Sequence, residues 1–355
     1  MRILITGACG FVGTTLCRAL RASAESNTLQ ICGIDNLSRP GSETNRSVLK
    51  QLDVHFVHGD IRVSTDLDTV GDVDWVIDAA ANPSVLAGVD GQTSSRQLVA
   101  HNLEGTINLL EFCKVRTAGF VLLSTSRVYS IASLARVAVE PVDGAFRPVV
   151  GAGIAGFSEC GVNEAFSTSS PVSLYGATKL ASEQLALEYG SSFGFPVWIN
   201  RCGVLAGAGQ FGRADQGIFS FWINAWLRNH PLRYIGFDGS GCQVRDCLHP
   251  RDLLPLLRAQ MSEGARPVHR VINVGGGVDN SLSLAQLSKW CAQRFGQRDV
   301  EVDPTQRPFD VPWVVMDCSQ AQRLWNWQPQ TPLTAVLSEI ADHAVDHPQW
   351  LELSR

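Results

Sequence analysis

A tyrosine and a lysine stand four residues apart in this 355-residue chain, at Tyr175 and Lys179. In a helix this spacing brings both side chains to one face. A phenol titrates near about 10, and a neighbouring ammonium lowers that pKa, so that the phenolate becomes accessible as a base closer to neutral pH. The chain contains only four lysines, which strengthens the signal. We therefore predict a catalytic pair, and the alternative is an ordinary surface pair.

A hydroxyl at the end of a predicted strand joins the candidate catalytic groups. Thr125 follows the apolar run 120–124. The carboxyl ends of parallel strands form the edge at which α/β sheets place ligands, so this hydroxyl can share a proton with a substrate. The alternative is a Ser/Thr turn that ends the strand.

Three glycines lie where a predicted strand turns into a predicted helix near the N-terminus. They follow the strand-like residues 3–6 with the spacing Gly-x-x-Gly-x-x-Gly. Glycines permit a tight turn and close packing, and the N–H groups and dipole of the new helix attract a pyrophosphate. The triplet alone also fits a plain tight turn. The predicted cofactor contacts in this turn are Gly7, Gly10, Phe11, Val12 and Gly13.

An acid at the end of the next predicted strand indicates which dinucleotide binds. Asp35 lies 22 residues after Gly13, where a carboxylate accepts hydrogen bonds from the hydroxyls of an adenosine ribose. Its charge repels a 2′-phosphate, so the sequence favours NAD over NADP, although Arg39 nearby weakens the distinction. Further predicted cofactor contacts, each with a structural role as its alternative, are Asn36, Asp60, Ile61, Ala79, Ala80, Asn102, Ser124, Tyr175, Lys179 and Arg201.

Short apolar strands alternating with helices must position these groups. Continuous apolar runs predict strands buried on both faces, hence a parallel sheet between helices, the doubly wound, Rossmann-type α/β class. The predicted strands are 3–6, 31–35, 54–57, 75–79, 120–124 and 197–200, and the predicted helices are 13–23, 96–114 and 175–189.

The alternation of predicted strands and helices changes after residue 204, where glycine-rich turns follow. We predict an NAD-binding domain over 1–204, to which 244–274 returns, and a smaller substrate-binding domain over 205–243 and 275–355. The long stretch between residues 129 and 175 predicts a loop that shapes a sugar pocket.

Composition and charge exclude several classes of function. The formal net charge of −5 and the lack of Lys/Arg runs provide no field for nucleic acid or a membrane surface. No apolar stretch approaches about 18 residues and no signal-like leader is evident, so we expect a cytoplasmic protein. The ten cysteines are dispersed, and neither they nor the eight histidines form a ligand cluster. We therefore expect reduced thiols and no metal site.

The glycine turn, the acid after the second strand, the strand-end hydroxyl and the Tyr/Lys pair occur in a characteristic order and at characteristic distances. They resemble the extended short-chain dehydrogenase/reductase family of sugar-nucleotide epimerases and dehydratases, over nearly the whole chain. The resemblance implies that Tyr175 is the general base, Lys179 binds the nicotinamide ribose and lowers the phenol pKa, and Thr125 assists at the reacting hydroxyl. It also implies a homodimer packed through 96–114 and 175–189.

Motifs in the C-terminal half are similar to those of family members that invert C2 of a CDP-linked deoxyhexose. These motifs are Gln210-Phe211, Asp215-Gln216-Gly217, Gln243-Val244-Arg245-Asp246, Leu248-His249, Asp252, Asn273-Val274-Gly275-Gly276 and Asn280-Ser281-Leu282-Ser283-Leu284. The resemblance implies that Arg245 and Arg307 hold the nucleotide diphosphate, which suits guanidinium chemistry. A surface charge or structural ion pair is the alternative for each arginine. Further predicted substrate contacts are Ser126, Arg127, Gln210 and Gln216.

Three departures from the family pattern bear on the reaction. The histidine common after the fourth strand is Asp78 here. The residues after Thr125 are Ser126-Arg127, where dehydratases use Asp and Glu to expel water, so dehydration is disfavoured. Many 4-epimerases place an asparagine shortly after the strand that ends near Arg201. No such asparagine is evident in 201–204, which weakens the interpretation as a 4-epimerase.

These observations predict redox-neutral inversion at C2 of a CDP-linked deoxyhexose with tightly bound NAD. The alternative within the family is a 4-epimerase or another redox enzyme acting on a UDP-, dTDP- or GDP-sugar. The alternative from another class is a non-catalytic NAD-binding scaffold or sensor, which has no need of the hydroxyl, phenol and ammonium together.

Overall fold

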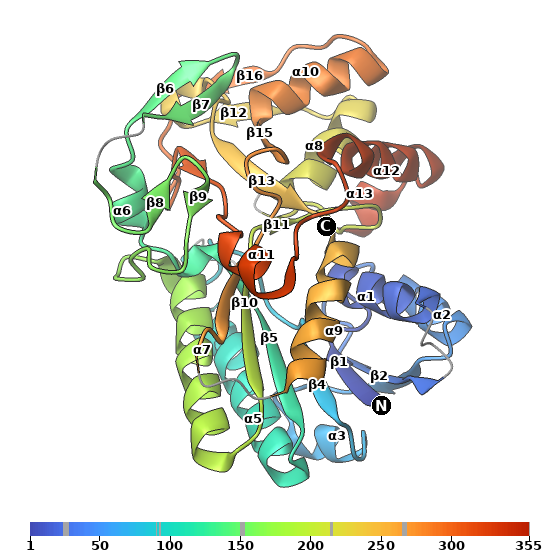
Figure 1. The fold of residues 1–355 in the computed structure, drawn as a ribbon. Helices are drawn as coiled ribbons and strands as arrows, with labels where there is room; N and C mark the ends of the chain where they lie inside the picture. The colour runs from blue at the N-terminus through green and yellow to red at the C-terminus, as the bar shows by residue number, and fades with distance from the viewer. Residues whose placement is uncertain are drawn as a thin grey trace. The chain divides into compact units, whose positions relative to one another are not determined.

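Seven strands form one sheet in the order β14-β10-β5-β4-β1-β2-β3 (Figure 1). The pairs β1–β2, β1–β4, β2–β3 and β4–β5 run parallel. The strand order reverses between β1 and β4, the point at which such sheets bind ligands. This sheet confirms the predicted doubly wound α/β class. Its strands are β1 (Arg2–Thr6), β2 (Gln30–Asp35), β3 (His55–His58), β4 (Trp75–Asp78), β5 (Gly119–Thr125), β10 (Val197–Cys202) and β14 (Val271–Val274).

Helices cover both faces of the seven-stranded sheet because the strands are apolar on both sides. In Figure 1, α5 and α7 lie on one side of the central strands, and α1 and α9 lie on the other. The helices of this part are α1 (Phe11–Ala22), α2 (Asn45–Gln51), α3 (Ser64–Asp68), α4 (Ser95–Val99), α5 (Gly105–Arg116), α7 (Ser173–Phe193) and α9 (Leu253–Glu263).

The segment predicted as one helix over 96–114 is three pieces. A capping box between Ser94 and Gln97 begins α4, and a π-helical turn, Ala100–Glu104, separates α4 from α5. The extra residue of a π turn changes the direction of the side chains that follow it. Hydrophobic periodicity does not reveal such a turn, because its flanks remain helical.

The chain divides into two compact units, called unit 1 and unit 2. Unit 1 comprises Met1–Thr125, Leu174–Arg201 and Pro250–Ile272. Unit 2 comprises Ser126–Ser173, Cys202–His249 and Asn273–Arg355. The residues that the structure describes are 1–23, 28–89, 91, 94–149, 153–213, 216–264 and 268–354.

Unit 2 is built on a small sheet with the order β11-β13-β15, in which β17 also pairs with β13. Its core packs apolar side chains of α8, α10 and α12. The strands are β6 (Val139–Val142), β7 (Ala145–Pro148), β8 (Phe157–Ser158), β9 (Gly161–Val162), β11 (Val204–Leu205), β12 (Arg233–Ile235), β13 (Val244–Leu248), β15 (Ser281–Ser283), β16 (Glu301–Asp303) and β17 (Trp313–Val314). The helices are α6 (Ile131–Ala135), α8 (Ile218–Leu227), α10 (Leu284–Phe295), α11 (Ser319–Trp325), α12 (Leu333–Asp346) and α13 (Trp350–Leu353).

Two stretches differ in placement from the sequence expectation. Residues 126–173 pack in unit 2, where the Phe146 N–H donates to the Cys242 carbonyl at 2.8 Å. Of the stretch 244–274, β14 joins the seven-stranded sheet, whereas β13 pairs antiparallel with β15 in the small sheet. An apolar run of strand length does not specify its pairing partner, because that partner lies far away in the sequence.

Candidate active site

The glycine turn joins β1 to α1 in a conformation that excludes side chains. Gly7 has φ of +61°, in the left-handed region. A Cβ on Gly13 would stand 2.2 Å from the Gly7 carbonyl oxygen and 2.8 Å from the Ala8 Cα. Gly10 is the N-cap of α1, and no side chain caps the helix there. The N–H groups of the first turn, from Phe11 onward, therefore suit a pyrophosphate.

Asp35 is held beside this turn by backbone hydrogen bonds. Its Oδ2 accepts the Cys9 N–H at 2.9 Å and its Oδ1 accepts the Leu37 N–H at 2.8 Å. Burial raises the pKa of Asp35, and the backbone donors oppose that shift. Each carboxylate oxygen accepts more than one hydrogen bond, so Asp35 retains capacity for ribose hydroxyls. Together the uncapped helix and the anchored acid fit an adenosine dinucleotide.

Asn36 and Asp60, predicted separately, are joined by a hydrogen bond. Asn36 Nδ2 donates to Asp60 Oδ2 at 2.9 Å. The Arg62 guanidinium also binds this carboxylate, with Nη2 2.6 Å from Oδ2, and holds the pKa of Asp60 well below its usual range. The neighbouring Ile61 contributes its carbonyl oxygen, which accepts the Asn108 amide at 2.9 Å. Arg62 is a partner that the sequence analysis does not identify.

A buried hydroxyl organises the strand end that carries Ala79 and Ala80. Thr6 Oγ1 donates to Asp78 Oδ1 at 2.7 Å and accepts the N–H groups of Ala79 at 3.1 Å and Ala80 at 3.0 Å. Thr106 Oγ1 lies 3.4 Å from the other Asp78 oxygen. Asp78, which replaces the family's histidine, is therefore a structural acceptor between strands and helix.

Asn102 connects the β4 loop to α7 from within the π turn. Its Oδ1 accepts the Asn82 N–H at 2.8 Å, and its Nδ2 donates to the Asn82 carbonyl at 3.1 Å and to Thr178 Oγ1 at 3.2 Å. Thr178 in turn donates to the Tyr175 carbonyl at 2.8 Å. These contacts make Asn102 a residue that positions the first turns of α7. Its contact with the cofactor stays a prediction.

Tyr175 and Lys179 lie on consecutive turns of α7. Their exposed fractions are 7% and 2%. Tyr175 packs in a cluster with Ala87 and Leu98. A lysine this deeply buried is unusual unless its ammonium has partners. Such burial is not what a surface pair predicts, and it favours the catalytic interpretation.

Ser124 and Arg201, both predicted cofactor contacts, meet at a buried acid. Ser124 Oγ donates to Glu183 Oε1, and Arg201 Nη2 lies 2.7 Å from Glu183 Oε2. Glu183 is fully buried and stands one helical turn after Lys179. Thr125 follows Ser124 as the last residue of β5. Glu183 is not among the predicted site residues, and its only sequence signal is its place one turn after Lys179 on α7.

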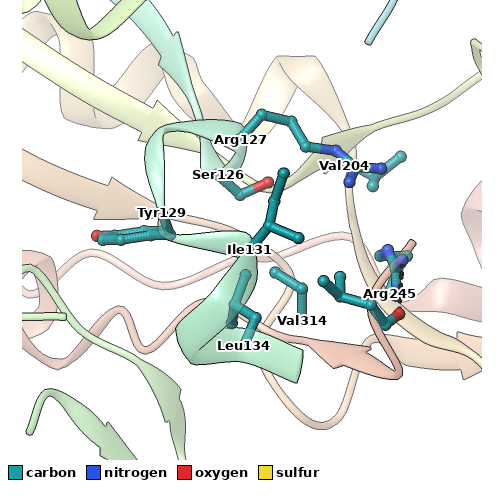
Figure 2. Close-up of a pocket in the computed structure, with 9 residues that line it drawn as sticks. Ser126, Arg127, Tyr129, Ile131, Leu134, Val204, Arg245 and Val314 are labelled. Atoms are coloured by element: carbon teal, nitrogen blue, oxygen red, sulfur yellow. Dashed lines mark hydrogen bonds between the residues drawn. The ribbon is translucent and has the colours of Figure 1, made fainter. Parts of the chain in front are cut away.

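Three of the predicted substrate residues line one cavity in unit 2. Ser126, Arg127 and Arg245 line this cavity (Figure 2). Apolar side chains form most of the remaining wall. They are Ile131, Leu134, Val204, Val311 and Val314, with Tyr129 beside them. The wall thus combines two guanidinium groups and the Ser126 hydroxyl with a surface that is mostly aliphatic.

Two of the predicted substrate arginines reach the segment 307–311. Arg245 Nη2 donates to the Val311 carbonyl at 2.9 Å and lies 3.3 Å from Asp310 Oδ1. Arg127 Nη1 lies 3.5 Å from the carbonyl of Phe309, within this segment. Burial lowers the pKa of Arg245, and the charge of Arg307 lowers it further while Asp310 opposes the shift. The structure therefore gathers Arg127, Arg245, Arg307 and Asp310 into a group that we call the cationic cluster.

Gln210 and Gln216 are not among the described residues that line this cavity. Gln210 Nε2 donates to the Leu205 carbonyl at 2.7 Å. The Gln216 N–H donates to the Arg213 carbonyl at 3.1 Å. Substrate contacts for both glutamines stay predictions, and residue 215 of the same motif lies outside the described residues.

Searches of the described residues for other sites found neither a membrane span nor a metal centre. No helix in the described part of the chain is long and apolar enough to cross a membrane. Over the same residues, no group of three or more His, Cys, Asp or Glu side chains is placed to hold a metal ion.

Comparison with known proteins extends the family resemblance to the whole chain. A sequence profile of the NAD dependent epimerase/dehydratase family matches residues 3–275. CDP-paratose 2-epimerase from Salmonella typhi is 30% identical over 344 residues, which cover 93% of this chain and 95% of that protein. An uncharacterized UDP-glucose epimerase from Bacillus subtilis is 27% identical, with 96% and 97% covered. The structure of UDP-glucuronic acid 4-epimerase from Bacillus cereus, in complex with UDP-glucuronic acid and NAD, aligns with a TM-score of 0.74 at 27% identity, covering 98% and 99%.

Proposed function

Because the chain belongs to the NAD-dependent epimerase/dehydratase family, we propose that it inverts C2 of a CDP-linked deoxyhexose. In this proposal the carbon is oxidised to a ketone, the sugar presents its other face, and the carbon is reduced again. The glycine turn and Asp35 would hold NAD, which would supply the hydride acceptor for the first half and the hydride donor for the second. The net redox change is zero, so turnover requires no exchange of the cofactor.

The residues of α7 and the β5 end supply the proton chemistry. Tyr175 Oη takes the proton of the reacting hydroxyl and gives it back when the carbon is reduced. The Lys179 ammonium stabilises the phenolate, and the Thr125 hydroxyl donates a hydrogen bond to the substrate oxygen. Burial of Tyr175 and Lys179 supports these roles, because an electrostatic interaction is stronger where water is excluded.

The composition of the unit 2 cavity carries the proposal for the substrate. Arg127 and Arg245 suit the diphosphate of a nucleotide sugar. Ile131 and Leu134 suit a sugar carbon that lacks a hydroxyl, because a hydroxyl against them would lose its hydrogen-bond partners. The identity of 30% with a CDP-paratose 2-epimerase supports the same substrate class.

Inversion of C4 in a UDP-sugar is the second candidate. Structural relatives support it, since the Bacillus cereus protein is a UDP-glucuronic acid 4-epimerase. The residues 201–204 weigh against it, because they lack the asparagine of many 4-epimerases.

A panel of nucleotide sugars tests the proposal. Purified protein is expected to retain NAD through gel filtration and to convert a CDP-linked 6-deoxyhexose without added cofactor. NMR of the product identifies the inverted carbon, and UDP-, dTDP- and GDP-sugars serve as the matched comparison. Strict dependence on added NAD with accumulation of NADH would contradict epimerisation, and inversion at C4 would support the second candidate.

Association of two copies through α5 and α7 is part of the same proposal. Val115 on α5 is 73% exposed and Phe193 on α7 is 50% exposed, which gives these helices apolar surface outside their own unit's core. Light scattering after gel filtration tests it, with Val115→Asp/Phe193→Asp as the variant expected to shift a dimer to a monomer.

A further inference from the structure

An indole near the end of the chain holds the segment that begins at Gln210. Trp350 Nε1 donates to the Gln210 carbonyl oxygen at 2.8 Å. Its ring also stacks on Phe211, with centroids 5.0 Å apart and planes 18° from parallel. The exposed fraction of Trp350 is only 7%, so both interactions are shielded from water. The side chain thus fixes two consecutive residues of unit 2.

The same C-terminal turn fixes the segment at a second point. The Arg213 Nε–H donates to the Ser354 carbonyl oxygen at 2.8 Å. Arg213 also forms a two-way backbone bridge with Gln216, with N to O distances of 2.6 and 3.1 Å. Ser354 Oγ donates to the Trp350 carbonyl at 2.8 Å, which links the two points of attachment.

Gln210 is held from the inner side as well. Ser220 Oγ on α8 donates to the Gln210 carbonyl at 2.9 Å, so this oxygen accepts two donors. A Cβ on Gly217 would stand 3.0 Å from the Gln210 side chain. Gln210 is therefore held by α8 and by Trp350, and Gln216 is joined through its backbone bridge to Arg213, which binds Ser354.

We propose that Trp350 is a positioning residue for substrate binding, acting through Phe211 and the Gln210 carbonyl on the placement of Gln216. This inference rests on the proposed function, because it assumes that Gln216 binds the nucleotide sugar. Loss of the Trp350 contacts loosens Gln210 and Phe211 before binding, so substrate binding carries the cost of ordering them. The residues proposed to hold NAD lie in unit 1, so NAD retention is expected to stay unchanged.

Two substitutions of Trp350 separate its hydrogen bond from its packing. Trp350→Phe keeps an aromatic ring but removes the N–H donor, and we expect KM for the nucleotide sugar to rise about 5-fold, as for one lost hydrogen bond. Trp350→Leu also removes the stack, and we expect a rise of at least about 20-fold. The control is Leu353→Ala on the same short helix, where the side chain is 39% exposed.

The readouts distinguish positioning from general loss of structure. We expect kcat, bound NAD and the Tm of Trp350→Phe to remain near wild type while KM rises. A rise in KM of less than 2-fold in both variants, or equal losses of kcat and bound NAD, would overturn the proposal.

Gln216→Ala separates failure of this inference from failure of the proposed function. KM is measured on whichever nucleotide sugar the panel shows to be converted, so the identity of the sugar does not affect the test. A raised KM in Gln216→Ala that is not raised further by adding Trp350→Phe supports positioning through Gln216. A fully multiplicative double mutant, or an unchanged KM in Gln216→Ala, overturns it, whereas the proposed function fails only if no CDP-deoxyhexose is inverted at C2.

Discussion

The two units stabilise buried carboxylates in different ways. In unit 1, Glu183 is buried against the Arg201 guanidinium, 2.7 Å away. In unit 2, the buried Asp246 accepts the N–H groups of Gly276 at 2.9 Å and Met316 at 3.4 Å, and burial raises its pKa to about 6. For Asp246, burial raises the pKa, and the backbone N–H donors oppose that shift without cancelling it.

The arginines of the two units differ in the same respect. Arg201 is paired with the carboxylate of Glu183, so its charge is matched without a ligand. The cationic cluster has three guanidinium groups and the carboxylate of Asp310, and the charge of the buried Asp246 also acts on Arg245. We infer that the Arg201–Glu183 pair forms a charge-matched frame within unit 1, whereas the guanidinium groups of unit 2 gather around one segment, 307–311.

Removal of the Tyr175 hydroxyl, in unit 1, is the change with the largest expected effect. It tests whether this phenol is the proton acceptor. Tyr175→Phe is expected to lower turnover by about 10²- to 10⁴-fold, because the proton acceptor is lost. NAD should remain bound, since the glycine turn and Asp35 are intact. Turnover is measured by NMR and NAD by absorbance after gel filtration, with Tyr189→Phe on the same helix as control. Turnover within tenfold of wild type would contradict the role of Tyr175.

Removal of the acid from the buried pair is expected to destabilise the frame. Glu183→Ala leaves the Arg201 charge buried without its partner, so the free energy of unfolding should fall by about 3–5 kcal/mol. Urea unfolding measures the change, and the exposed Glu188→Ala on α7 is the control. Adding Arg201→Met should restore part of the loss. Equal free energies of unfolding for Glu183→Ala and Glu188→Ala would show that the Arg201–Glu183 pair does not stabilise unit 1.

Asp246 should make the stability of unit 2 depend on pH. Its pKa of about 6 in the folded protein exceeds the ordinary value of 3.8, so the folded state binds more protons between these values. Protonation of Asp246 therefore contributes fully to the free energy of unfolding below pH 4. This contribution, about 3 kcal/mol for two pKa units, is lost as the pH rises through 6. Asp246→Asn should flatten this part of the stability curve, and the exposed Asp279→Asn should not. Parallel curves for Asp246→Asn and wild type would contradict the comparison.

Removal of one cation from the cluster is expected to have the smallest effect. Arg245→Ala should raise KM for the nucleotide sugar by about 10- to 100-fold, as for one or two charge-assisted hydrogen bonds, with bound NAD unchanged. Added salt should weaken substrate binding less in the variant than in wild type. The control is Arg294→Ala, an exposed pair with Asp342. An unchanged KM would remove Arg245 from the substrate site.

The sequence predicts unit 1 well because its signals are local. The runs 3–6, 31–35 and 75–79 are buried on both faces, so their apolar pattern alone identifies strands. The glycine turn is similarly local, since Gly7 and Gly13 meet within seven residues. The partners that complete this unit are less visible, because Thr6 contacts Asp78, which lies 72 positions later in the sequence.

Unit 2 is harder to predict because its contacts join distant segments. Arg127 reaches the carbonyl of Phe309, which is 182 positions away. The stretch 126–173 contains two short hairpins whose strands are too brief to give a strong pattern. For the same reason the family resemblance identifies Arg245, while its neighbours Asp310 and Val311 appear only in the folded structure.

The π turn at Ala100–Glu104 sets the angular register between α4 and α5. One residue of an α-helix corresponds to a rotation of about 100°. Deleting a single residue from this turn would therefore rotate the apolar side of α5 away from the sheet, or carry Asn102 away from Thr178. We therefore expect a one-residue deletion here to be far less tolerated than a substitution at the same place. The geometry of the site thus depends on the number of residues in this turn as well as on their side chains.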